Sequence, residues 1–353
     1  FPRPVAEIPI QNVYYLLCYA WKQMEEGKVA ETGAAQQTGV VNLLGTVLAN
    51  GTERVLKQGL DRGYVTQSET TSRPRGQIDF DTSLKRALFP KAKAHCHYDA
   101  LSRDVVHNRI LKSTLRELIQ ARKIDENLRD RLRLLTRRFG DVGDVNLRRS
   151  LFQRVQLHSG NAFYKFLLHI CSLIERNLTP TEDGTGKKFR DFLREEATMW
   201  KLFEKFTYHF YRREQERYDV SAPHIDWDVS GEAPEQLPNM RTDVVLSSPA
   251  RTIILDAKFS KDVLSEHREK KLFKSENLYQ LFAYLQNAEA TEEGFEDAEG
   301  MLLYPTMEPT LDDELGRFEV RGHQMRICTV DLNQKWDRIH EDLLALVDAR
   351  QES

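Results

Sequence analysis

The spacing of apolar and polar residues along the chain changes repeatedly, and it predicts both helices and strands. Apolar residues at intervals of three and four are typical of helices that pack on one side. This spacing occurs at residues 13–24, 41–56, 105–119, 162–174, 192–211, 276–286 and 335–347. Shorter stretches typical of strands occur at residues 64–68, 77–80, 240–246, 252–259, 300–304 and 324–330. The order predicts an α/β (α+β) fold in which helices flank a mixed β-sheet.

The length of the chain predicts two domains. Its 353 residues exceed the roughly 250–300 at which a single core usually stops growing. We expect a mostly helical N-terminal domain with some strands at residues 1–155, and a second domain with the mixed sheet at residues 156–353. No apolar run is long enough to predict a membrane span. Four scattered cysteines favour reduced thiols and a cytoplasmic protein.

Two acids are expected to face each other across a hairpin. The strands at 240–246 and 252–259 would fold about a tight turn, in a register that pairs Val244 with Leu255 and Asp243 with Asp256. Directly opposed residues have Cβ atoms about 4.5–5.5 Å apart. Two carboxylates at that separation repel each other unless a cation such as Mg²⁺ lies between them.

The second strand carries an Asp-x-Lys triplet. Because side chains alternate, Asp256 and Lys258 share one face of the strand while the other face is apolar. We expect the Asp-x-Lys face to be free for chemistry, with a metal that activates water and stabilises charge on a phosphate, and with the lysine orienting the nucleophile. An ordinary surface hairpin with a solvated ion pair is the alternative interpretation.

Two helices offer further candidates. Gln280 and Tyr284 lie one turn apart in the expected helix 276–286, hence on one face. Packing against the sheet would explain them equally well. Glu204, in the helix predicted at 192–211, is a candidate additional metal ligand, although its flanking lysines also suit a surface ion pair.

The order of these motifs resembles that of the PD-(D/E)xK nucleases, specifically their RecB-like branch. Four further stretches extend the resemblance over nearly the whole chain. They lie at residues 8–21, 75–80, 104–115 and 237–243. Together they are similar to the McrC family, the nuclease subunit of the McrBC modification-dependent restriction system.

This resemblance implies a PD-(D/E)xK restriction-endonuclease-like core and a type IV restriction endonuclease subunit that cuts double-stranded DNA carrying 5-methylcytosine. It implies a catalytic set of Asp243, Asp256 and Lys258, completed by Gln280 and Tyr284, and Mg²⁺ held by Asp243, Asp256 and Glu204. The implied partner is a McrB-like AAA+ GTPase hexamer, which the N-terminal domain would engage and stimulate. A RecB-like repair nuclease and a non-catalytic activator of a GTPase are the alternatives.

Two other motifs do not predict sites. The stretch 184–188 resembles the end of a phosphate loop but lacks two required residues. Thr181 stands where the loop has its first glycine, and Lys188 stands where it has Ser or Thr after the lysine. GTP is therefore expected on the partner and no nucleotide site in this chain. His95 and His97 alternate with Cys96 on a strand, and no second ligand pair follows at zinc spacing, so zinc is not expected.

The net charge of −3 leaves DNA contacts to local basic stretches. The stretch 120–154 favours a solvated helix face. The stretch 267–274 follows the Asp-x-Lys strand closely, and we expect it to contact DNA.

Overall fold

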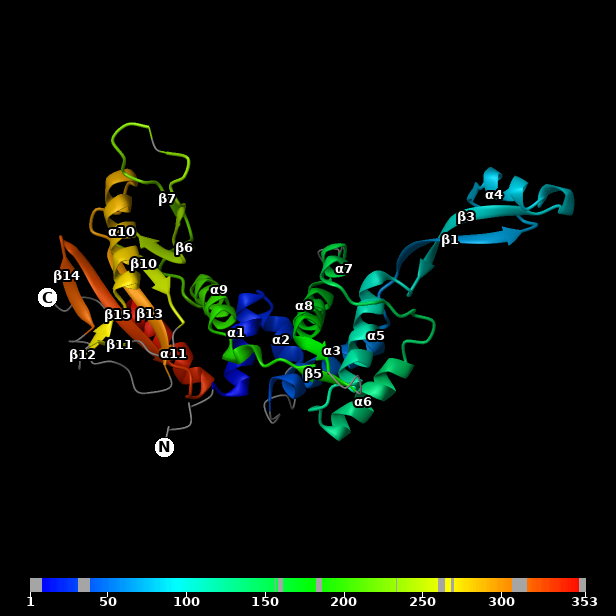
Figure 1. The fold of residues 1–353 in the computed structure, drawn as a ribbon, viewed down its shortest axis with the longest axis horizontal. Helices are drawn as coiled ribbons and strands as arrows, with labels where there is room; N and C mark the ends of the chain where they lie inside the picture. Colours follow the sequence, from blue (N-terminus) through cyan, green and yellow to red (C-terminus); the bar gives the residue numbers. More distant parts are fainter. Residues whose placement is uncertain are drawn as a thin grey trace. The chain divides into compact units, whose positions relative to one another are not determined.

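The computed structural model describes residues 8–30, 39–155, 157, 161–181, 186–232, 234–259, 264–267, 270–306 and 316–348, with backbone alone at 28–30, 194, 264–267 and 270–272. The chain forms two compact units (Figure 1). The sheet unit comprises Phe1–Met24 and Asp191–Ser353, and the helical unit comprises Glu25–Arg190. The division expected between residues 155 and 156 therefore falls inside the helical unit. The division fails for two reasons. The helix Ala162–Asn177 packs on the earlier helices Val40–Gln58 and Val106–Ile119, and the first helix, Ile10–Ala20, packs on the later helix Glu196–Glu214.

A six-stranded mixed sheet forms the centre of the sheet unit, as the sequence predicted. Its strand order is β14-β15-β13-β10-β9-β6. β10, β13 and β15 are parallel to one another, and the remaining neighbours are antiparallel. The strands are β6 (Asp219–Ser221), β9 (Val244–Ser248), β10 (Arg251–Ala257), β13 (Glu299–Thr306), β14 (Arg317–Val320) and β15 (His323–Asp331). Short two-stranded ladders join β7 (His224–Ile225) to β8 (Met240–Arg241) and β11 (Leu264–His267) to β12 (Lys270–Phe273).

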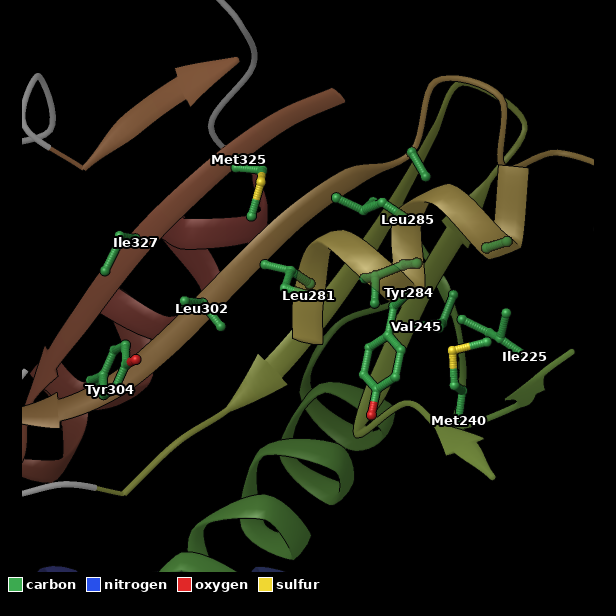
Figure 2. Close-up of a cluster of buried hydrophobic side chains, with 13 residues drawn as sticks. Ile225, Met240, Val245, Leu281, Tyr284, Leu285, Leu302, Tyr304, Met325 and Ile327 are labelled. Atoms are coloured by element: carbon green, nitrogen blue, oxygen red, sulfur yellow. The ribbon is translucent and has the colours of Figure 1, made fainter. Parts of the chain in front are cut away.

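Helices α9 (Glu196–Glu214), α10 (Ser275–Thr291) and α11 (Trp336–Asp348) contact this sheet. Leu281 and Leu285 of α10 pack on Ile254 and Leu302 in a buried cluster, shown in Figure 2. The alternate strand residues, such as Leu255, are also fully buried. Both faces of the central strands are therefore covered.

The first helix, α1 (Ile10–Ala20), belongs to the sheet unit because it packs on α9. The buried Asn12 side chain donates hydrogen bonds to the carbonyls of Leu332 and Gln334, at 2.9 and 2.8 Å. Tyr19 donates to Glu214 at 2.8 Å. The stretch 8–21 thus closes the sheet unit with residues from the opposite end of the sequence.

The helical unit contains α2 (Met24–Ala30), α3 (Val40–Gln58), α5 (Val106–Ile119), α6 (Glu126–Arg137), α7 (Arg149–Gln153) and α8 (Ala162–Asn177), with a short hairpin of β4 (Leu178–Pro180) and β5 (Lys187–Phe189). Buried apolar residues of α3 pack against α5, α6 and α8. This mostly helical composition, with some strands, agrees with the prediction.

A three-stranded antiparallel sheet completes the helical unit, in the order β1-β3-β2. Its strands are β1 (Gly63–Thr71), β2 (Gln77–Ile78) and β3 (Ala94–Ser102), with α4 (Phe80–Lys85) and the 3-10 turn Phe89–Lys91 between β2 and β3. No residue of β1 is buried. Gly76 has φ +69°, and a Cβ there would lie 2.2 Å from the His97 carbonyl oxygen, so the entry to β2 requires glycine.

The stretch 104–115 has a structural role in this unit. Arg109 binds both carboxylate oxygens of Asp104, at 2.7 and 2.6 Å. Asn108 donates to the carbonyls of Asp61 and Arg103. These bonds hold the start of α5 against the end of the three-stranded sheet.

Much of the first basic stretch is engaged within the helical unit. Arg129 donates to three backbone carbonyls, Arg131 pairs with Glu53 at 2.8 Å, and Arg133 pairs with Asp130 at 2.7 Å. All four cysteines are thiols. Among the described residues, no helix is both long and apolar enough to cross a bilayer.

Candidate active site

The hairpin has the predicted register up to the two acids. Leu255 pairs with Val244, and the ladder ends there. Asp243 lies just before β9, and its Oδ2 accepts a hydrogen bond from the Ala257 N–H at 2.8 Å. This bond ties the first acid to the backbone of the strand that carries the second.

The Asp-x-Lys triplet is not on an open face, so that prediction is wrong. The Asp256 residue is 1% exposed and Lys258 8%. The reason is that α10 packs on this face, which Asp256 shares with the buried Ile254. The Lys258 Nζ lies 2.6 Å from the Asp256 Oδ2, so the buried carboxylate has a cation beside it. A buried pair of this kind is costly to break, because the remaining charge is left without compensation.

Gln280 and Tyr284 join this pair through consecutive hydrogen bonds. Lys258 Nζ donates to Gln280 Oε1 at 2.8 Å, and Gln280 Nε2 donates to the Tyr284 hydroxyl at 2.7 Å. The hydroxyl in turn donates to the Arg241 carbonyl at 3.0 Å. Figure 2 shows the Tyr284 ring reaching from α10 toward Met240, the neighbour of Arg241. The predicted helix face therefore both packs on the sheet and binds the lysine.

Burial raises the pKa values of both acids. Burial, followed by the charges of Asp256 and Glu204, raises the pKa of Asp243 to about 7, although the Ala257 N–H opposes the shift. Burial also raises the pKa of the Asp256 carboxyl against the stabilising effect of Lys258. The side chain of Glu204 is therefore close enough for its charge to act on Asp243. Because these buried acids resist ionisation, a cation bound beside them would stabilise their charged forms.

Helix α9 contributes Trp200, which the sequence interpretation missed. Its indole Nε1 donates to the Ala257 carbonyl at 3.0 Å, and the Lys258 Nζ lies 5.7 Å from the ring centroid. Trp200 thus fixes both the strand end and the lysine. Its position one turn before Glu204 was the available signal, because residues four apart share a helix face.

The donor set fits a hard divalent cation. Asp243, Asp256 and Glu204 offer carboxylate oxygens, the ligands that Mg²⁺ prefers. The raised pKa values of Asp243 and Asp256 mean that bound metal would stabilise their ionised forms. Within the described ranges, however, the one group of three ligand side chains with ligand atoms within 4.8 Å of one another lies elsewhere, at Asp79, His95 and His97. The ligand atoms of Asp243, Asp256 and Glu204 would have to come closer together to hold one ion.

The chain matches the family model described as McrBC 5-methylcytosine restriction system component over residues 9–305. It is also 32% identical over 344 residues to the Type IV methyl-directed restriction enzyme EcoKMcrBC of Escherichia coli K12, covering 97% of each sequence. The chain belongs to the McrC family. A solved structure with a similar fold is the Thermococcus gammatolerans assembly of McrB AAA+ hexamers with bound McrC. The match has a TM-score of 0.53 at 16% identity and covers 93% of this chain and 78% of that one.

Family membership places the network within a restriction-system component. The second basic stretch, 267–274, lies mostly outside the side chains that the structure describes. Its expected DNA contact therefore stays a prediction.

Proposed function

We propose that this chain is the Mg²⁺-dependent DNA endonuclease subunit of a type IV restriction complex that acts on 5-methylcytosine-containing DNA. The observation that carries the proposal is the network from Asp256 through Lys258 and Gln280 to Tyr284, beside Asp243. Its residue types and order match the PD-(D/E)xK pattern. Membership of the McrC family supports the same assignment.

Each residue has a distinct proposed role. Asp243 and Asp256 would bind the metal, with Glu204 as a further ligand. Mg²⁺ bound there would act as a Lewis acid that stabilises charge on the scissile phosphate. Lys258, held by Gln280, is positioned to orient the nucleophile or to neutralise charge. Tyr284 fixes the orientation of the Gln280 amide, because it accepts from Nε2.

We further propose that the chain works with a McrB-like AAA+ GTPase hexamer, which binds the GTP and recognises the methylated base. The Thermococcus gammatolerans relative is described as bound to McrB AAA+ hexamers, and that description supports the partner. The helical unit, Glu25–Arg190, would engage the partner and stimulate its GTP hydrolysis. The sheet unit, Phe1–Met24 with Asp191–Ser353, would contain the endonuclease core.

Cleavage assays on matched DNA substrates test this function. Methylated and unmethylated circular DNA are incubated with the chain, with and without its cognate GTPase, GTP and Mg²⁺. We expect cutting of methylated circles with all components present, and loss of cutting with EDTA. Cutting of linear DNA ends by the chain alone would favour a RecB-like repair nuclease. Stimulated GTP hydrolysis without cutting of any substrate would favour a non-catalytic activator.

A further inference from the structure

A second candidate metal site lies in the helical unit, outside the network described above. Asp79, His95 and His97 present one ligand atom each, and these atoms all lie within 4.8 Å of one another. All three side chains are partly accessible to solvent. No step of the proposed DNA cleavage uses them.

Strand pairing explains how the three side chains meet. His95 and His97 alternate with the buried Cys96 on β3, so both imidazoles lie on the face opposite the thiol. β2 pairs Gln77 with His97, and the Asp79 N–H extends the ladder by donating to the His95 carbonyl at 2.8 Å. Asp79 therefore falls on the same face as the histidines. The sequence alone did not predict a metal site at His95 and His97, and this pairing adds a third candidate ligand to them.

The spacing suits tetrahedral coordination. Zinc binds imidazole nitrogen and carboxylate oxygen at about 2.0–2.2 Å, which places neighbouring ligand atoms of a tetrahedral site roughly 3.3–3.5 Å apart. The His97 Nε2 and the Asp79 Oδ2 are 3.4 Å apart. This is longer than a strong charge-assisted hydrogen bond, about 2.7–2.9 Å, but close to a zinc-bridged separation. The His95 ligand atom lies within 4.8 Å of both.

Neighbouring groups already orient the ligands. The Asp79 carboxylate accepts from the Thr82 N–H at 2.9 Å and from its hydroxyl at 2.6 Å, and these bonds hold its pKa down at about 2. The His95 Nδ1 lies 3.1 Å from the Thr70 hydroxyl, leaving Nε2 for another partner. Outer contacts of this kind fix ring and carboxylate orientation in metal sites.

We propose that Asp79, His95 and His97 bind Zn²⁺, with water in the fourth position. The two imidazoles are borderline ligands, and their presence beside the carboxylate favours zinc over Mg²⁺. The ion would join the N-terminus of α4 to β3. It would thereby hold the segment from β2 to α4 on the three-stranded sheet.

The test uses the full chain, metal-free and without a histidine tag. Zn²⁺ is titrated calorimetrically, and Co²⁺ is titrated with the visible absorption of a four-coordinate site as readout. We expect Asp79→Asn to weaken this binding by at least ~100-fold, beyond the loss expected for an outer contact. Asparagine still caps α4, so the variant keeps the local fold. Asp81→Asn is the matched control, because Asp81 is exposed on the same helix.

Two further variants sharpen the result. His97→Gln should abolish the same binding event, and Thr82→Val should weaken it by about tenfold by releasing the Asp79 carboxylate. Wild-type Zn²⁺ binding with loss in Asp79→Asn and His97→Gln, but not in Asp81→Asn, supports the site. Unchanged affinity and stoichiometry in both ligand variants would overturn it. Absence of a four-coordinate Co²⁺ spectrum in the wild type would also overturn it.

Discussion

Asp243 and Asp79 both accept a hydrogen bond from a backbone N–H near a strand end, yet their carboxyl groups differ in acidity. The Ala257 N–H contacts Asp243 at 2.8 Å, and the Thr82 N–H contacts Asp79 at 2.9 Å. The pKa is about 7 for Asp243 and about 2 for Asp79. Burial and neighbouring acids dominate at Asp243, whereas the two bonds from Thr82 dominate at Asp79. The wider environment therefore outweighs a single backbone hydrogen bond.

Because the carboxyl groups differ in acidity and in their neighbours, the two regions are expected to bind different cations. Around Asp243 the candidate ligands are carboxylates, and their resistance to ionisation favours a divalent ion of the Mg²⁺ type. Asp79 is readily ionised and lies beside two imidazoles, which favour zinc.

Replacing Lys258 with methionine should cause a large loss of DNA cleavage. Asp256 would be left buried without the cation 2.6 Å from it. We expect DNA cleavage per GTP hydrolysed by the partner to fall by about 10²–10³-fold, the scale for loss of one stabilising group in an active site.

Lys85→Met is the matched control for this variant. Lys85 lies at the same 2.6 Å distance from Asp81, but both side chains are largely exposed. Its effect on cleavage should be less than about twofold, because exposed ion pairs contribute little. Equal losses in the two lysine variants would contradict the account.

Mg²⁺ affinity should depend on pH in the Asp243 region. Metal binding requires ionised carboxylates, and with a pKa of about 7 the ionised fraction of Asp243 rises roughly tenfold between pH 6 and 8. Calorimetry should therefore show about tenfold tighter Mg²⁺ binding at pH 8, with proton release. Asp79→Asn should leave this dependence intact, since Asp79 is already ionised at pH 6. A flat profile would count against the raised pKa.

Tyr284→Phe should reduce cleavage by a smaller factor, about fivefold on the scale of one neutral hydrogen bond. It removes the hydroxyl that accepts from Gln280 and donates to the Arg241 carbonyl, while keeping the buried ring. Tyr279→Phe is the control, because Tyr279 lies on the same helix with 71% of its surface exposed. The rate of cleavage at saturating Mg²⁺ distinguishes them. Indistinguishable rates would remove Tyr284 from the functional network.

Asp243→Asn should stabilise the metal-free chain at high pH. Because the pKa is raised from 3.8 to about 7 in the folded state, protonation of Asp243 stabilises the fold fully below pH 3.8, and this contribution is lost as the pH rises through 7. At pH 8 the variant avoids the buried charge, and we expect its Tm to rise by about 3 °C. At pH 4 the gain should vanish, and Asp79→Asn should give none at either pH. A lower Tm for Asp243→Asn at pH 8 would contradict this reasoning.

The hairpin shows how far sequence reasoning extended. Alternation and turn position gave the Val244–Leu255 register, because both are local properties of the chain. The burial of Asp256 was missed, because it depends on where α10 packs. Trp200 was missed for the same reason, as its contact with the Ala257 carbonyl spans distant segments.

The domain boundary and the third ligand beside the histidine pair also depend on contacts between segments distant in the sequence, which local patterns do not predict. The stretch 8–21 could be recognised, but its packing on α9 depends on side chains more than 180 residues away, such as Glu214. His95 and His97 could be placed on one face of a strand. Asp79 lies beside them because β2 pairs with β3. β2 has only two residues, so its apolar and polar pattern is too short to predict that pairing.

Asp256→Ala tests the central claim most directly, when DNA cleavage and partner GTP hydrolysis are measured in the same reaction. Because Asp256 is buried beside Lys258 and is a proposed metal ligand, we expect cutting of methylated DNA to vanish while stimulation of GTP hydrolysis persists. Glu319→Gln, an exposed change on β14, should alter neither activity. Cleavage by Asp256→Ala at the wild-type rate would contradict the assignment of this network as the nuclease site.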